Sequence, residues 1–141
     1  MIFSQTKIYR TKHKSEPIFF LSDDEKKIIL VLSHVEFTNP IFTENLKKTT
    51  QALGFDFEKE VVVTSVPENG SFNWSGLLLQ NRPMYICFFG NHLSGIPNLS
   101  TNTSVKLSHH TLFQTFTMNE IVTEQYKKGE FWINFKSLFS A

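Results

Sequence analysis

The segment Ile28–Ser33, which reads IILVLS, constrains the fold of this chain more than any other stretch. Its five consecutive aliphatic residues do not alternate with polar ones, and such a run indicates a strand covered on both faces, because a buried helix needs about ten to twelve residues. Asn39-Pro40 follows after a short polar loop. Asn is a good N-cap and Pro fits the first helical position. The segment therefore predicts the first strand–helix unit of an open, mostly parallel sheet.

The rest of the chain continues this alternation of buried strands and helices. Strands are predicted at 28–33, 61–64, 84–89 and, more weakly, 104–108. Helices are predicted at 40–53, 71–80 and 109–116, and from the capping box at Thr117–Glu120 onward, with a break at Gly129. Right-handed crossovers then give a three-layer α/β/α sandwich with a mostly parallel four-stranded sheet. A length of 141 residues fits a single domain, which is placed at 21–141, after an N-terminal arm at 1–20.

Composition excludes several classes of function. The net charge of +1 argues against a protein whose affinity for nucleic acid comes from phosphate neutralisation, so direct nucleic-acid binding is expected to be weak or absent. The single cysteine, Cys87, lies in an apolar run and is predicted to be a buried structural residue. Neither a signal peptide nor an apolar run of membrane-spanning length is present, so the expected location is the cytoplasm.

The arm at 1–20 mixes basic and apolar side chains. Its simplest interpretation is a solvated, frayed terminus, since chain ends are often disordered. The functional alternative is a segment that orders on a protein partner. The side chains that such a segment offers for partner binding are Phe3, Lys7, Ile8, Tyr9 and Arg10.

A ligand-binding edge is predicted where the strands end, because open parallel sheets bind ligands beyond their carboxyl ends. The candidate residues at that edge are His34, Glu36, Asn91, His92, His109 and His110. These histidines suggest a metal or acid–base site, but polar loops also explain them, and their spacing matches no known ligand signature. Phosphate-binding glycine loops and a nucleophile elbow are absent. No cofactor, metal or catalytic residue is therefore predicted.

Four stretches carry a family resemblance. They are IILVLSHVEFTNP (28–40), LGFDFEKEVVVTSV (53–66), PMYICFFGNHLSGIP (83–97) and KKGEFWINFKSLF (127–139). In these stretches and in the order of its elements, the chain resembles the psi subunit of bacterial DNA polymerase III, a small α/β/α protein whose fold is related to uracil-DNA glycosylases. The resemblance implies a non-catalytic DNA-replication accessory protein that contacts the clamp loader, through its N-terminal peptide, or the single-strand-binding machinery.

The related glycosylases offer a second comparison. They place a glycine and a water-activating Asp or Asn after the first strand, and a His-Pro-Ser type loop after the last. Here the first loop is Ser33-His34-Val35-Glu36, and the last, Ser108–Leu112, has no proline. The chain is therefore predicted not to be an enzyme. Two alternatives remain open: a degenerate or divergent glycosylase-like domain that binds nucleic acid or a nucleotide at the strand ends, and a domain that self-associates through Phe131, Trp132 and Phe135.

Overall fold

A computed structural model of the chain describes residues 27–67, 70, 83–90, 93–95, 99–107 and 109–139. Three predictions lie outside these residues. They are the arm at 1–20 with all its partner-binding side chains, the helix at 71–80, and the edge residues Asn91 and His92.

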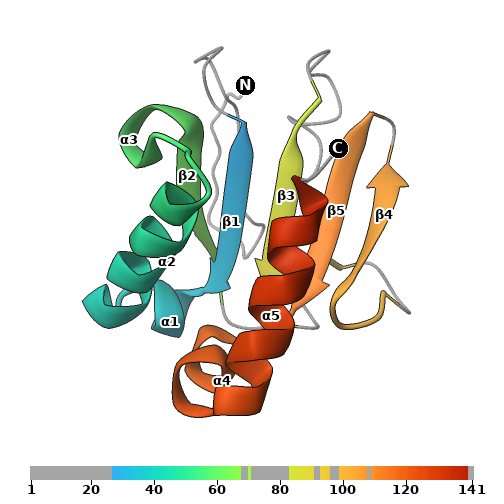
Figure 1. Cartoon of the computed structure of the whole chain (residues 1–141). Coiled ribbons are helices and arrows are strands. Elements are labelled where there is room, and N and C mark those ends of the chain that lie inside the picture. Colours follow the sequence, from blue (N-terminus) through green and yellow to red (C-terminus); the bar gives the residue numbers. More distant parts are fainter. Residues whose placement is uncertain are drawn as a thin grey trace, which may run out of the picture.

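The described residues form an α/β fold built on a five-stranded, mostly parallel sheet (Figure 1). Its strands are β1 (Ile28–Ser33), β2 (Val61–Val66), β3 (Tyr85–Phe89), β4 (Thr103–Leu107) and β5 (His110–Thr115), in the spatial order β2-β1-β3-β5-β4. The first four strands in this order are parallel, and only β4 is antiparallel to its neighbour β5. The predicted α/β class and mostly parallel sheet are confirmed, with five strands rather than four. The second helix layer of the predicted three-layer sandwich stays a prediction, because the helix predicted at 71–80 lies outside the described residues.

The fifth strand corrects the helix predicted at 109–116. Within this segment, His110–Thr115 form β5, which pairs with β3 on one side and with β4 on the other. The sequence HHTLFQTF has no clear helical or strand period, and a short apolar segment of this kind is ambiguous from periodicity alone. Long-range pairing with β3 settles its conformation, because a central strand gains two hydrogen-bonded neighbours.

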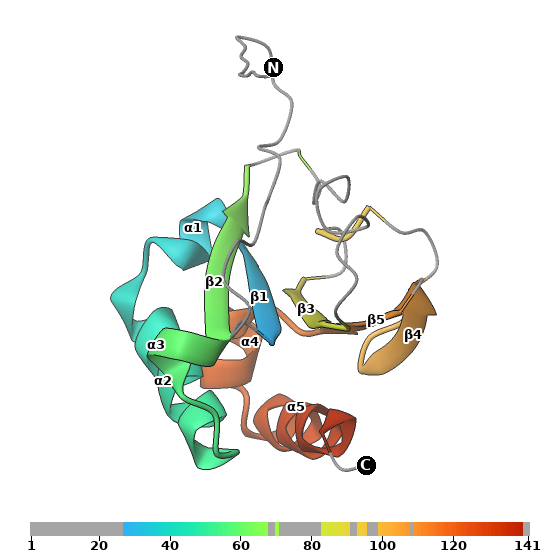
Figure 2. The same ribbon diagram turned by 90° about the horizontal axis from the view of Figure 1, so that it is seen from above.

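The described helices are α1 (His34–Phe37), α2 (Pro40–Ala52), α3 (Phe57–Glu60), α4 (Met118–Thr123) and α5 (Gln125–Leu138). Figure 2 shows all of them on the same face of the sheet. The start of α2 is as predicted, because the Asn39 side chain accepts a hydrogen bond from the Ile41 N–H. Gly54 follows α2 with a φ of 92°, a left-handed conformation that favours glycine. None of the helices in the described part of the chain is long and apolar enough to cross a membrane.

The break predicted at Gly129 is wrong. Gly129 lies inside α5, and the chain instead bends at Glu124, whose φ of −117° and ψ of 111° are extended. A glycine in a helix interior costs only about 0.5–1 kcal/mol relative to alanine, which neighbouring helical residues offset. The capping box at Thr117 and Glu120 is confirmed, so the helical segment starts where the sequence places it.

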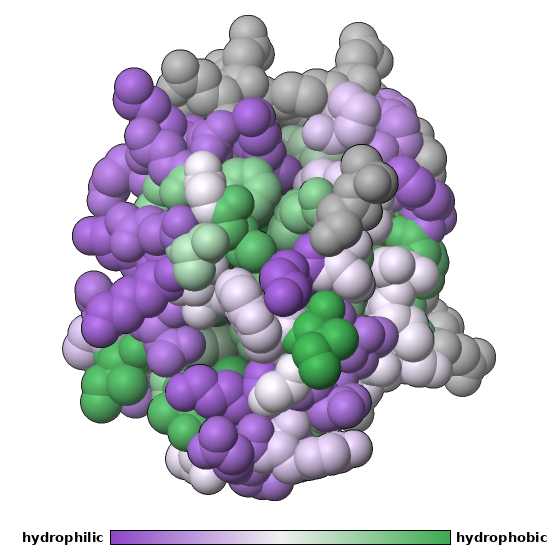
Figure 3. Space-filling model, in the orientation of Figure 1, coloured by the Kyte–Doolittle hydropathy of each residue, from purple (hydrophilic) through white to green (hydrophobic). Residues whose placement is uncertain are grey.

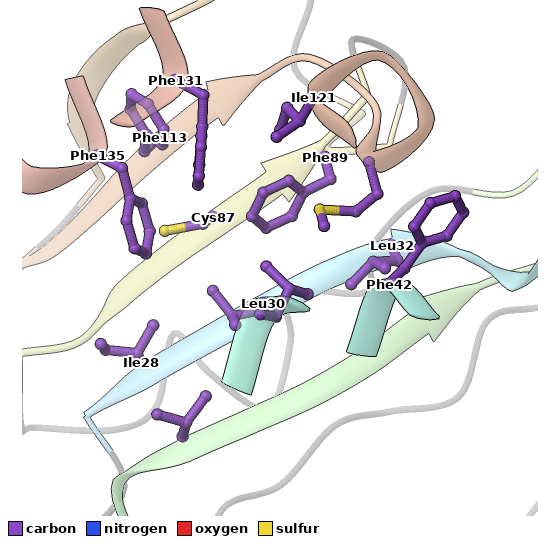
Figure 4. Close-up of a cluster of buried hydrophobic side chains, with 13 residues drawn as sticks. Ile28, Leu30, Leu32, Phe42, Cys87, Phe89, Phe113, Ile121, Phe131 and Phe135 are labelled. Carbon is purple, nitrogen blue, oxygen red and sulfur yellow. The ribbon is translucent and has the colours of Figure 1, made fainter. Parts of the chain in front are cut away.

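Both faces of the central strand β1 are buried, as its sequence predicts. Ile28, Leu30 and Leu32 face the helices, where they pack with Phe42, Cys87, Phe89, Phe131 and Phe135 (Figure 4). Ile29 and Val31 face the opposite side and belong to a second cluster that includes Ile86, Phe88 and Leu112. Cys87 is fully buried, and desolvation raises the pKa of its thiol, consistent with a structural role.

Candidate functional site: the carboxyl edge of the sheet

The strand order places a topological switch point between β1 and β3. From β1 the chain first forms β2 on one side and later β3 on the other. In open α/β sheets, ligands bind in the crevice outside the carboxyl ends of two such strands. The described residues at this edge follow β1 in α1, follow β3 at Gly90 and follow β5 at the start of α4.

Glu36 joins the end of β1 to the start of α4. The Ser33 hydroxyl caps α1 by accepting a hydrogen bond from the Glu36 N–H, at 3.3 Å. The Glu36 carboxylate then accepts hydrogen bonds from the N–H groups of Met118 and Asn119, each at 2.9 Å. A helix start carries N–H groups without intrahelical partners and favours a negative charge. Here the protein's own carboxylate satisfies these groups, beside the switch point.

The start of α4 is fixed by further charged contacts. The Thr117 hydroxyl accepts a hydrogen bond from the Glu120 N–H, and the Glu120 carboxylate accepts one from the Thr117 N–H. Lys127 on α5 lies 2.7 Å from Glu120 and 3.5 Å from Glu124. The Lys127 hydrogen bond holds the pKa of Glu120 below its usual range, and Glu120 in turn raises the pKa of Lys127. The α4–α5 corner is therefore held by side chains that already have partners.

A polar cluster secures the carboxyl end of β5. The Thr115 hydroxyl donates to the Asn102 side-chain oxygen, and the Gln114 side-chain amide donates to the carbonyl of Leu99, both at 2.6 Å. Asn102 has a φ of 58°, a conformation that asparagine tolerates better than most residues. Gln114 is fully buried, and its Oε1 atom has no hydrogen-bond donor among the described residues. Sequence reasoning missed this cluster, because burial of Gln114 depends on tertiary packing.

The histidines predicted at this edge do not all lie there. His34 follows β1 at the carboxyl edge and is exposed, whereas His109 and His110 lie at the amino end of β5. The two groups are separated by the length of a six-residue strand, about 20 Å. The prediction that they share one edge is wrong, because β4 is antiparallel and its end lies at the opposite edge from the ends of its parallel neighbours.

The two neighbouring histidines form a contact of their own. The rings of His109 and His110 have centroids 4.6 Å apart, and His110 is fully buried. No cluster of three or more His, Cys, Asp or Glu side chains suited to a metal ion occurs among the residues that the structure describes. That search does not extend to His92 or Asn91, so their contribution to the edge stays a prediction.

Exposed apolar side chains are distributed over several places rather than one face. Figure 3 shows separate green areas divided by polar surface. Val35 and Ile41 are 74% and 64% exposed near α1 and α2, and Tyr126 and Ile133 are 76% and 63% exposed on α5. The aromatic face proposed for self-association is not available. Its members Phe131 and Phe135 are buried against the sheet, and Trp132 is partly buried with the Lys136 ammonium 5.7 Å from its ring centroid.

Comparison of the chain with protein-family models found no match, and comparisons with curated proteins and with solved structures found no significant match either.

Proposed function

We propose that this protein is a non-catalytic accessory protein of DNA replication that acts in the cytoplasm through protein–protein contacts. Its partners in this proposal are the clamp loader or the single-strand-binding machinery, as the resemblance to the psi subunit of DNA polymerase III implies. The arm residues Phe3, Lys7, Ile8, Tyr9 and Arg10 supply the contact with the clamp loader.

The observation that best supports a binding role is the arrangement of Glu36. An enzyme of this strand order uses the ends of β1 and β3 to hold a ligand. In this protein the residues after β1 are instead tied to α4 by the two hydrogen bonds from Met118 and Asn119 to Glu36. A carboxylate in this position disfavours an anionic ligand such as a phosphate group, because like charges repel at short range.

The alternative of a glycosylase-like domain loses support from the same region. That hypothesis predicts that His34, Glu36, His92 and His109 or His110 converge on one pocket. Among its described members, His109 and His110 lie at the opposite edge from Glu36 and His34. A protein-contact role needs no such convergence, and exposed apolar side chains such as Val35 and Tyr126 are available for contacts.

Affinity purification of the tagged full-length protein from its own cells, followed by mass spectrometry, tests this proposal. We expect clamp-loader or single-strand-binding proteins to co-purify. A full-length variant carrying Ile8→Asp and Tyr9→Asp should lose the clamp-loader proteins, because charged groups replace the apolar contacts of the arm. A matched variant, Thr11→Ala with His13→Ala, changes the same arm outside the proposed contact residues and should retain them.

Two results would contradict the proposal at different levels. If no replication protein co-purifies with the wild-type chain, the replication assignment is wrong. If replication proteins co-purify equally with the Ile8→Asp, Tyr9→Asp variant, the assignment stands and the role given to the arm is wrong.

A further inference from the structure

Three backbone hydrogen bonds of β5 show which of its residues direct their N–H and C=O groups toward the edge strand β4. The Thr111 N–H donates to the Met84 carbonyl, and the Thr115 carbonyl accepts a hydrogen bond from the Gly90 N–H. The backbone groups of Thr111 and Thr115 therefore point toward β3. The Gln114 carbonyl accepts from the Asn102 N–H on the other side. Successive residues of a strand direct their backbone groups to opposite sides. The even-numbered residues of β5 therefore face β4.

The register then identifies which backbone groups of β4 are unused. Gln114 lies opposite Thr103, and Leu112 lies opposite Val105. Thr103 and Val105 thus direct their backbone groups toward β5, whereas Ser104 and Lys106 direct theirs away from it. No described strand pairs with this outer edge. Two N–H and two C=O groups consequently form an open row suited to another extended chain.

The surroundings of β4 leave this edge accessible. Residues 103–106 are exposed and Leu107 is half-buried. Figure 2 shows β4 at the margin of the sheet, beyond α5, with no described helix over it. The strand contains no proline, one of the devices that commonly block edge pairing. Its single charge, Lys106, lies on the same sheet face as the helices, where it disfavours any added segment that does not supply the opposite charge. Its cationic side chain, Lys106, takes part in none of the ion pairs found among the described residues.

The side chains of β4 divide between the two faces. Lys106 lies opposite Thr111, and Val105 lies opposite Leu112, which belongs to the buried cluster on the face away from the helices. An added strand therefore meets a positive charge on one face and a 38% exposed valine on the other. Opposite charges and apolar pairs across neighbouring strands are both favourable.

We propose that the outer edge of β4 is a strand-addition site for an extended segment of a partner protein. The segment places an acidic side chain opposite Lys106 and an apolar side chain beside Val105. Backbone hydrogen bonds supply the affinity in this mode of recognition, and alternate side chains supply the specificity. The proposal does not depend on the replication assignment. It places a contact surface at the edge of the sheet opposite to β2.

A second copy of this chain fits the edge less well. Antiparallel pairing of two β4 strands brings both Lys106 side chains onto the same face, where their charges repel. A five-residue strand also buries much less than the about 800 Å² per partner of a standard protein interface. A linear segment needs no such area, so charge and size both favour a partner peptide.

Titration of the ¹⁵N-labelled full-length protein with a synthetic peptide tests the site. The probe is acetyl-Ser-Val-Glu-Val-Glu-Val-Ser-amide, and its matched control carries Lys at both Glu positions. We expect the amide signals of Ser104 and Lys106 to shift and their hydrogen exchange to slow at least about tenfold at saturation, because outward N–H groups become hydrogen-bonded. The control should bind about fivefold more weakly, since it faces Lys106 with a like charge.

Two variants separate the backbone and charge contributions. Ser104→Pro removes an outward N–H that the fold does not use, and edge strands tolerate proline at such positions. It should keep the fold and lower affinity for the Glu peptide at least about tenfold. Val105→Pro is the matched control, because it removes a bond to β5 and should disrupt the β4–β5 hairpin. Lys106→Glu should reverse the preference, so that the Lys peptide binds more tightly.

Several outcomes would overturn the proposal. One is no binding of the Glu peptide at millimolar concentration; another is binding that Lys106→Glu leaves unchanged. If Ser104→Pro does not fold, the assignment of the Ser104 N–H to the outer edge of β4 is wrong. A concentration-dependent dimer in sedimentation equilibrium, abolished by Ser104→Pro, would identify a second copy as the occupant and exclude the partner segment.

Discussion

Strands β1 and β4 belong to the same sheet, yet they differ in burial and in the number of strands that pair with them. All five aliphatic residues of β1 are fully buried, with one strand on each side and apolar clusters on both faces. Four of the five residues of β4 are exposed, and among the described strands β4 pairs only with β5. Strand β1 therefore supplies stability, whereas β4 contributes little to the core and has backbone groups on its outer edge that no described strand uses.

The largest expected effect comes from truncating a side chain in β1. Leu30→Ala should lower the free energy of unfolding by about 2–5 kcal/mol, because it leaves a cavity among buried neighbours. Val105→Ala in β4 should cost less than about 0.5–1 kcal/mol, since Val105 is already 38% exposed. Urea denaturation of both variants measures the difference. Similar losses in the two strands would contradict the distinction drawn between them.

The ends of the two strands should differ as well. Glu36→Ala at the end of β1 removes the acceptor of two backbone hydrogen bonds and should cost about 1.5–3 kcal/mol. Amide hydrogen exchange should report the loss locally, with faster exchange at Met118 and Asn119. In the matched control, His34→Ala, an exposed neighbour in α1 is replaced and stability should stay almost unchanged. Equal effects of the two substitutions would remove the structural role assigned to Glu36.

A smaller effect tests the same contrast between exposed and buried positions at two glycines, Gly129 in α5 and Gly90 after β3. A Cβ atom added at Gly129 meets nothing within 4 Å, so Gly129→Ala should raise thermal stability, by about 0.5–1 kcal/mol. Gly90 is the opposite case, with a φ of 139° and Leu93 atoms at 3.5 Å from an added Cβ. Gly90→Ala should therefore destabilise the protein. If the midpoint temperatures of thermal unfolding shifted in the same direction for Gly129→Ala and Gly90→Ala, these expectations would be contradicted.

The smallest effect concerns the ion pair at the α4–α5 corner. The pKa of Glu120 is lowered by its hydrogen bond from Lys127, so its stabilising contribution is present above the pKa of the unfolded chain and is lost as pH falls through the lower folded value. NMR titration of the Glu120 carboxyl group should show this lowered pKa, and Lys127→Ala should move it back toward the ordinary value. A pKa that does not respond to Lys127→Ala would exclude the pair as its cause.

Local sequence signals predicted the elements that depend on few residues. The aliphatic run predicted β1, Asn39-Pro40 predicted the start of α2, and the capping box predicted the start of α4. The sequence did not predict β5, because its apolar residues follow no clear period and its conformation depends on pairing with β3. The bend at Glu124, rather than at Gly129, likewise has no local signal stronger than the glycine.

The candidate site divides in the same way. Glu36 was among the residues predicted at the sheet edge, and it lies there. Its partners Met118 and Asn119 are 82 and 83 residues away in the sequence, so no local pattern reveals the contact. His109 and His110 were placed at the wrong edge, because the direction of β4 is a property of the sheet and not of the segment that precedes them.

The α/β class, the buried central strand and the main helix starts follow from local sequence patterns, because hydrophobic burial and capping act over a few neighbouring residues. The strand order, the contact of Glu36 with α4 and the outward hydrogen-bonding groups of Ser104 and Lys106 do not follow from local patterns. These features depend on which distant segments pair and in which direction, and such choices are settled by the packing of the whole sheet.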